Sequence, residues 1–186
     1  MMTFEQWLPR FLLQPQPKDR ATLAANAAVM LLMWPEQHQL QLLLTRRALH
    51  LRHHPGQISF PGGRLEAGET TLAAALREAE EEVGISPSQI QVLGSLPRIT
   101  TSSGFTVAPW IGLLAEAPTL SLQQSEVADA FSLPLSYALS NRYRQQRWFI
   151  QPYKNTHLHF LPYQGQLIWG ATAAILHQLA EQIQAP

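Results

Sequence analysis

The chain has 186 residues, 46% of them hydrophobic, and its 13 basic and 13 acidic side chains give a formal net charge of zero. This length and apolar fraction suit a single domain with one core, and a neutral chain creates no overall field to attract nucleic acid or an anionic membrane. Cysteine is absent, which excludes disulfides, thiolate metal sites and a cysteine nucleophile.

No targeting segment is evident in the sequence. The first residues lack the basic, apolar and small-residue order of a signal peptide, and no apolar run is long enough to span a bilayer. We therefore expect a cytoplasmic protein without nucleic-acid or membrane partners.

Residues 1–20 are predicted to form a short helix and a linker. Thr3 and Gln6 have the spacing of a capping box, the helix would extend to about Leu13, and Pro9 is expected to kink or end it. Its apolar side would consist of Trp7, Phe11 and Leu12. The two prolines in Gln14–Arg20 indicate a linker.

Two strands are predicted next. Ala27–Trp34 is a continuous apolar run, typical of a buried strand, and Pro35–Gln39 is a turn. Three leucines then alternate with polar residues, which indicates a partner strand: Leu40, Leu42 and Leu44. Arg46–Pro61 is rich in arginine and histidine and is predicted to be a basic loop, with a solvated connection as the alternative.

The stretch from Gly62 to Ile85 predicts a glycine loop followed by a helix. Thr70 or Thr71 can cap this helix, and Gly84 is typical of the position just past a helix end. Four apolar residues at helical spacing form one stripe: Leu72, Leu76, Ala79 and Val83.

A second face of the same helix carries three carboxylates. Glu78, Glu81 and Glu82 lie at positions i, i+3 and i+4, where each like-charged pair weakens a helix by about 0.2–0.5 kcal/mol. A divalent cation such as Mg²⁺ would make this interaction favourable, since it binds carboxylate oxygens together with substrate phosphates. The alternative is a solvated acidic face.

After this helix we expect strands at Ile90–Leu96 and Thr106–Leu114, separated by a Thr/Ser/Gly loop at Arg98–Phe105, and then a loop at Ala115–Gln124. Glu126 begins a segment followed by a further strand.

The last elements are a hairpin and a helix. Strands at Arg144–Tyr153 and Thr156–Leu161 would turn at Lys154 and Asn155. The second strand places His157 and His159 on one face, but nothing nearby in the sequence completes a metal-ligand set. A closing helix follows Trp169–Thr172, with a core side formed by Ile175, Leu176, Leu179 and Ile183.

Residues 63–85 resemble the Nudix box. The match covers the fixed glycine, acidic and arginine positions, namely Gly63, Glu69, Arg77, Glu78, Glu81, Glu82 and Gly84, followed by Ile85. The single departure is Ala79, where the general pattern has a larger aliphatic residue. So many fixed positions make this a specific resemblance.

The preceding segment resembles the extra motif of the coenzyme A diphosphatase branch of the Nudix hydrolases. The matching residues are Thr45, Arg47, Leu51, Arg52, His54, Gly56, Gln57, Phe60, Pro61, Gly62 and Gly63. Ala48 departs from the motif, which has serine there. Gly104 and Phe105 resemble the branch's later loop, and the start of the closing helix, Trp169–Thr172, also resembles this branch.

The resemblance implies a single Nudix domain over residues 1–186, of α/β (α+β) class, with a mixed sheet sandwiched between helices. It implies Mg²⁺ or Mn²⁺ bound by Glu78, Glu81, Glu82 and the Gly62 carbonyl, with Glu126 as a further metal ligand or general base. Gly63, Glu69 and Arg77 would support the box, and Arg77 would pair with a box glutamate such as Glu69. Arg47, Arg52 and Phe105 would contact substrate.

The implied reaction is hydrolysis of coenzyme A, or of an acyl or oxidised form, to 4′-phosphopantetheine and adenosine 3′,5′-bisphosphate. A Nudix diphosphatase acting on ADP-ribose or another nucleoside diphosphate derivative is the alternative within the same class. A Nudix-fold binding protein without catalysis is a third option, which the full set of three glutamates disfavours. A homodimer is compatible with the sequence.

Overall fold

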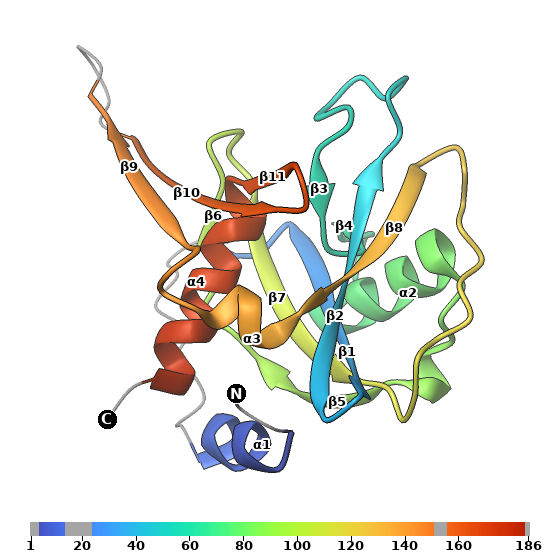
Figure 1. The fold of residues 1–186 in the computed structure, drawn as a ribbon. Coiled ribbons are helices and arrows are strands. Elements are labelled where there is room, and N and C mark those ends of the chain that lie inside the picture. The colour runs from blue at the N-terminus through green and yellow to red at the C-terminus, as the bar shows by residue number, and fades with distance from the viewer. Residues whose placement is uncertain (1–3, 14–23, 151–155, 185–186) are drawn as a thin grey trace.

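A mixed eight-stranded sheet forms the centre of the computed structural model, which describes residues 4–13, 24–150 and 156–184 (Figure 1). Its main path is β3 (Ile58–Ser59), β2 (Gln39–Arg47), β1 (Ala27–Glu36), β7 (Thr106–Leu113) and β5 (Gln91–Ser95). Three further strands pair beside this path: β4 (Gly62–Arg64) with β1, β6 (Ile99–Thr100) with β7, and β8 (Val127–Pro134) with β2. Strands β1 and β7 are parallel and the other pairs are antiparallel.

Strand β1 changes its antiparallel partner along its length. Its first residues, Ala27 to Val29, pair with β4, whereas Met33 to Glu36 pair with β2. Strand β2 diverges from β1 after these pairs. Its residues Gln41 to Arg47 pair with β8, and Thr45 and Arg46 also pair with β3. The short glycine strand β4 therefore lies where β1 and β2 separate.

Helices cover both faces of this sheet, as the family resemblance implied. Helix α2 (Thr71–Val83) packs on β1, β4 and β7 and contributes to one apolar cluster. The other cluster contains α3 (Leu135–Leu139) and α4 (Ala171–Gln184), and α4 also packs on a second sheet of β9 (Gln145–Phe149), β10 (Thr156–Tyr163) and β11 (Gln166–Trp169). The predicted core side of α4 is confirmed, because Ile175, Leu176, Leu179 and Ile183 are buried.

Helix α2 begins and ends where its sequence predicts. The Thr70 side chain accepts a hydrogen bond from the Ala73 N–H at 3.2 Å, which identifies Thr70 as the cap and Thr71 as the first helical residue. Gly84 has a φ of 75°, and its N–H donates to the Glu80 carbonyl at 2.9 Å. A one-turn 3₁₀ helix, η1 (Pro87–Gln89), follows.

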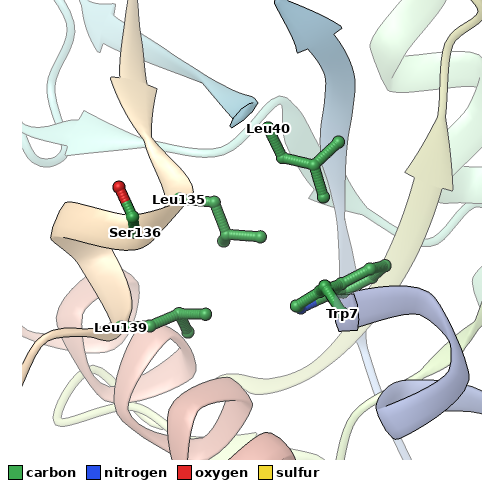
Figure 2. Close-up of a pocket in the computed structure, with 5 residues that line it drawn as sticks. All are labelled: Trp7, Leu40, Leu135, Ser136 and Leu139. Carbon is green, nitrogen blue, oxygen red and sulfur yellow. The ribbon is translucent and has the colours of Figure 1, made fainter. Parts of the chain in front are cut away.

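The N-terminal helix α1 (Phe4–Leu13) contains Pro9 and continues beyond it. The expectation that Pro9 could end this helix is therefore wrong, and the helix reaches Leu13 as predicted. Trp7 and Phe11 are buried and stack at 5.3 Å, but Leu12 is 51% exposed and does not belong to the apolar side. Trp7 also lines a pocket of about 10 Å³, room for about one water molecule, between α1, β2 and α3 (Figure 2). The other residues of this pocket are Leu40, Leu135, Ser136 and Leu139.

Several short elements were not predicted. Arg46 and Arg47 extend β2, and β3 interrupts the expected basic loop. Strand β6 lies within the expected loop before Phe105, and α3 and β11 have no counterpart in the prediction. Thr3, the linker at Gln14–Arg20 and the turn at Lys154 and Asn155 lie outside the described residues. Among the described residues, no helix is both long and apolar enough to cross a membrane.

Candidate functional site

The two glycines of β4 bring the backbone directly against α2. A Cβ atom at Gly63 would lie 2.1 Å from Glu78 Oε1, and one at Gly62 would lie 2.4 Å from the Ala28 carbonyl oxygen. The Gly62 N–H donates a 3.2 Å hydrogen bond to Glu82 Oε2. Glycine at position 63 therefore leaves room for the Glu78 carboxylate, and glycine at position 62 lets β4 lie close to β1.

Arg77 connects the remaining acidic groups of this region. Its Nε and Nη2 donate to the two carboxylate oxygens of Glu69 at 3.0 and 3.1 Å, so the predicted pair is present. Its Nη1 donates to Glu78 Oε1 and to Glu81 Oε2, both at 2.9 Å, and Nη2 also reaches the Arg64 carbonyl at 3.1 Å. The hydrogen bond from Arg77 lowers the pKa of Glu69, and the same pair raises the pKa of Arg77.

Glu82 is the most buried carboxylate of the set, with 4% of the residue exposed. Burial, and then the charge of Glu78, raises its pKa to about 8, against the opposing effects of the Gly62 N–H and Arg47. Burial also raises the pKa of Glu78, although its hydrogen bond with Arg77 opposes this, and Glu81 and Glu126 add to the increase.

These carboxylates fit a hard divalent cation by their chemistry. Glu78 repels Glu81, Glu82 and Glu126 electrostatically, and Glu82 and Glu126 also repel each other. A bound cation of charge +2 would relieve this repulsion and would favour the ionised form of Glu82. In the described part of the chain, however, no three acidic or histidine side chains already surround one point as a metal site. Arg77 instead binds Glu78 and Glu81.

Glu126 and the start of the basic segment are held together by the main chain. The Ala48 N–H donates to the Glu126 carbonyl at 2.8 Å, and His50 Nε2 lies 3.0 Å from the Ser125 carbonyl oxygen. Arg47 lies close enough to lower the pKa of Glu82, whereas Arg52 is exposed and makes no hydrogen bond or ion pair within the described residues. The structure thus brings Arg47 and Glu126 close to the carboxylates.

Phe105 lies at the edge of this region in contact with a residue that the sequence did not single out. The Arg64 guanidinium carbon lies 4.8 Å from the centre of the Phe105 ring. The only feature of the sequence that could have drawn attention to Arg64 is its position directly after the glycine pair. Its neighbour Phe105 is 41 residues away.

The histidine pair on β10 faces α4 rather than the carboxylates. The His157 and His159 rings lie 4.7 Å apart, and His177 of α4 lies 4.7 Å from His159. Burial, together with the neighbouring histidines, lowers the pKa of His159 to about 4. Within the described residues, these side chains do not form a metal-ligand set.

A comparison with known proteins gives the family. The NUDIX domain model matches residues 24–151. The relatives named uncharacterized Nudix hydrolase NudL include that of Photorhabdus laumondii, which is 41% identical over 99% of this chain and 100% of its own length. That of Yersinia enterocolitica is 42% identical over 97% of this chain and 93% of its own length.

Solved structures share the fold over a smaller part of the chain. A Nudix hydrolase of M. smegmatis, RenU, is 26% identical with a TM-score of 0.53, over 60% of this chain and 71% of its own. The C. elegans Ap4A hydrolase in a binary complex is 21% identical with a TM-score of 0.52, over 59% of this chain and 80% of its own. Because the family model covers more than half of the chain and the NudL relatives align over nearly all of it, this protein belongs to the Nudix hydrolase family.

Proposed function

We propose that this Nudix hydrolase is a coenzyme A diphosphatase, which cleaves the diphosphate bond of coenzyme A or a derivative to 4′-phosphopantetheine and adenosine 3′,5′-bisphosphate. The observation that carries the hydrolytic part is the buried Glu82 carboxyl, bound to the Gly62 N–H and close to the carboxylates of Glu78 and Glu126. The coenzyme A part is supported by the motif from Thr45 to Gly63. We extend the proposal to one functional domain over residues 1–186.

Members of this family generally use divalent metal ions. We propose that Glu78, Glu81, Glu82 and the Gly62 carbonyl hold Mg²⁺ or Mn²⁺. Such an ion, when bound, neutralises phosphate charge and lowers the pKa of a bound water. Arg77 keeps Glu78 and Glu81 next to the glycine strand through its hydrogen bonds. Releasing Arg77 from either carboxylate would free an oxygen for the ion.

Glu126 has two possible roles in this proposal. It is exposed immediately before β8, and its charge acts on both Glu78 and Glu82. From this position it either binds a further metal ion or takes the proton of the attacking water as general base. Its backbone carbonyl is already bound to Ala48, so the position of this residue does not depend on its carboxylate.

A binding protein without catalysis is a poorer explanation of the same residues. Glu82 is buried with a backbone N–H as its only hydrogen-bond donor among the described residues, an arrangement that disfavours its charged form. A protein that only bound a nucleotide would have no use for a buried carboxylate whose charged form is destabilised. A metal-dependent hydrolase requires such carboxylates to hold its ion.

A substrate panel tests the proposal. Purified protein with Mg²⁺ or Mn²⁺ would be offered coenzyme A, acetyl-coenzyme A, oxidised coenzyme A, dephospho-coenzyme A and ADP-ribose, with products identified by mass spectrometry. We expect the highest kcat/KM for a coenzyme A form, with the two products named above. A higher kcat/KM for ADP-ribose would contradict the coenzyme A assignment and leave a nucleoside diphosphate hydrolase. No metal-dependent cleavage of any of the five would contradict the hydrolase assignment.

A further inference from the structure

Beside the carboxylates, the structure contains a stacked pair of side chains that makes no contribution to metal binding. The exposed Arg64 guanidinium lies over the ring of the half-buried Phe105, at 4.8 Å from the ring centre. Within the described residues, the Arg64 side chain makes no hydrogen bond or ion pair. Its outer planar face and its N–H groups are therefore available to a ligand.

The backbone on both sides of this pair is held firmly. The Asn26 N–H donates to the Thr106 carbonyl at 3.0 Å, and the Thr106 N–H donates to Asn26 Oδ1 at 2.9 Å. The Asn26 carbonyl accepts from the Leu65 N–H at 3.1 Å. Asn26 therefore ties the residue after Arg64 to the residue after Phe105.

Phe105 is also fixed from its other side. Its N–H donates to Thr101 Oγ1 at 3.0 Å, and its carbonyl accepts from the Thr101 N–H at 2.8 Å. A stacked pair whose two backbones are held in this way is pre-organised, so a ligand that stacks on it does not have to order it first.

The pair is connected directly to the carboxylates. Arg77 Nη2 donates to the Arg64 carbonyl at 3.1 Å, and Nη1 of the same guanidinium binds Glu78 and Glu81. Gly63, which contacts Glu78, is the residue before Arg64. A nucleotide whose phosphates lie at the carboxylates would thus have its nucleoside near Arg64.

We propose that Arg64 and Phe105 form a nucleobase site in which the adenine of the substrate stacks on the outer face of the Arg64 guanidinium. Bases commonly stack on arginine planes and on aromatic rings, and Arg64 would lie between the base and Phe105. This inference rests on the proposed function for the identity of the base. It assigns to Arg64 the recognition of the adenosine half of the substrate.

The test measures binding of a base without any catalysis. The probe is 1,N⁶-ethenoadenosine 5′-monophosphate in EDTA, followed by its fluorescence. We expect Arg64→Ala and Phe105→Leu to weaken binding about tenfold, as the loss of one stacking contact predicts. Arg64→Lys should weaken it as much as Arg64→Ala, because an ammonium group has no plane on which a base can stack. Competition by ribose 5-phosphate should be the same in wild-type and Arg64→Ala protein.

A matched control is available on the opposite side of the sheet. Arg142 lies over the Tyr143 ring at 5.7 Å, and Tyr143 packs against the cluster on the α4 side, so Arg142→Ala should bind the probe like wild type. Wild-type binding by Arg64→Lys would overturn the inference, as would an equal loss of affinity for ribose 5-phosphate in Arg64→Ala. So would a lack of probe binding by wild-type protein.

The two proposals can fail separately. Probe binding that depends on Arg64, in a protein that cleaves no diphosphate substrate, would contradict the proposed function and keep the nucleobase site. Cleavage of coenzyme A with an unchanged KM in Arg64→Ala would keep the function and overturn the site.

Discussion

The Gly62 N–H donates a 3.2 Å hydrogen bond to Glu82 Oε2, which joins the glycine strand β4 to the most buried carboxylate of α2. Without a cation, this bond and the charge of Arg47 do not offset the burial of Glu82, and its pKa rises to about 8. Stability and activity should therefore both depend on how the charge of Glu82 is compensated.

The first prediction concerns pH and stability in EDTA. A carboxyl group with a pKa higher in the folded than in the unfolded chain stabilises the fold at low pH, and this contribution is lost as the pH rises from about 4.5 through about 8. The slope for one group is at most about 1.4 kcal/mol per pH unit. We expect Tm to fall more between pH 6.5 and 8 in wild type than in Glu82→Gln.

This pH range lies above the one in which the half-buried His159 affects stability. The pKa of His159 is lowered to about 4, so its cost to stability appears only below about pH 6.5, the usual histidine value. Saturating Mn²⁺ should remove most of the wild-type slope between pH 6.5 and 8. Identical slopes for wild type and Glu82→Gln in EDTA would show that Glu82 is ionised in the folded protein, contrary to this account.

A methyl group at Gly63 should displace Glu78. The added Cβ would lie 2.1 Å from Glu78 Oε1, so the carboxylate has to move. We expect Gly63→Ala to reduce kcat at least tenfold and to weaken Mn²⁺ binding measured by calorimetry. In a double-mutant cycle, Gly63→Ala should cost less stability in a Glu78→Ala background, where the clash is absent. If the stability losses of Gly63→Ala and Glu78→Ala simply add in the double mutant, the added methyl group does not clash with Glu78.

Glu126, which immediately precedes β8, can be tested against a nearby acid on that strand, Asp129. Both Glu126 and Asp129 are exposed, but the side chain of Asp129 accepts a hydrogen bond from the Ala130 N–H at 2.9 Å, whereas the charge of Glu126 helps to raise the pKa of Glu82. Glu126→Gln should lower kcat by at least tenfold with little change in Tm, whereas Asp129→Asn should leave kcat near wild type. Unchanged kcat in Glu126→Gln would make Glu126 an ordinary surface residue.

Arg47 and Arg52 should recognise different phosphates. Arg47 lies near Glu82 and is expected to contact the diphosphate, whereas the exposed Arg52 is available for the 3′-phosphate. Each charge-assisted contact contributes roughly 1.5–3 kcal/mol, so each Ala variant should raise KM about tenfold or more. Arg47→Ala should do so for both coenzyme A and dephospho-coenzyme A, but Arg52→Ala mainly for coenzyme A.

Arg46→Ala is the control for these kinetics, because Arg46 is the neighbouring half-buried arginine of β2. Equal KM increases on both substrates with a lower Tm, in both the Arg47 and Arg52 variants, would indicate that these arginines only hold the loop together.

The sequence predicted the elements whose signals are local. The limits of α2 follow from a capping threonine, an apolar stripe and a terminal glycine, and the longer strands follow from apolar runs and alternation. Strands β3 and β6 have two residues each and exist only because β2 and β7 offer partners. Short segments of this kind have no periodicity to detect, and the same holds for the five-residue helix α3.

In the candidate site, too, the features within one short segment could be predicted and those that join distant segments could not. The helical spacing of Glu78, Glu81 and Glu82 and the pairing of Arg77 with Glu69 could be predicted because they lie within one short segment. The stacking of Arg64 on Phe105 joins segments 41 residues apart and depends on how β4 and β7 flank β1.

The most direct test of the central claim is the turnover of coenzyme A by wild-type and Glu82→Gln protein at matched Mg²⁺ or Mn²⁺ concentrations, with products identified by mass spectrometry. We predict metal-dependent formation of 4′-phosphopantetheine and adenosine 3′,5′-bisphosphate by wild type. The kcat of a folded Glu82→Gln variant should be lower by at least 100-fold, on the order expected for loss of a metal ligand, and Glu81→Gln should behave similarly. Near-wild-type turnover in folded Glu82→Gln protein with excess metal would contradict the account.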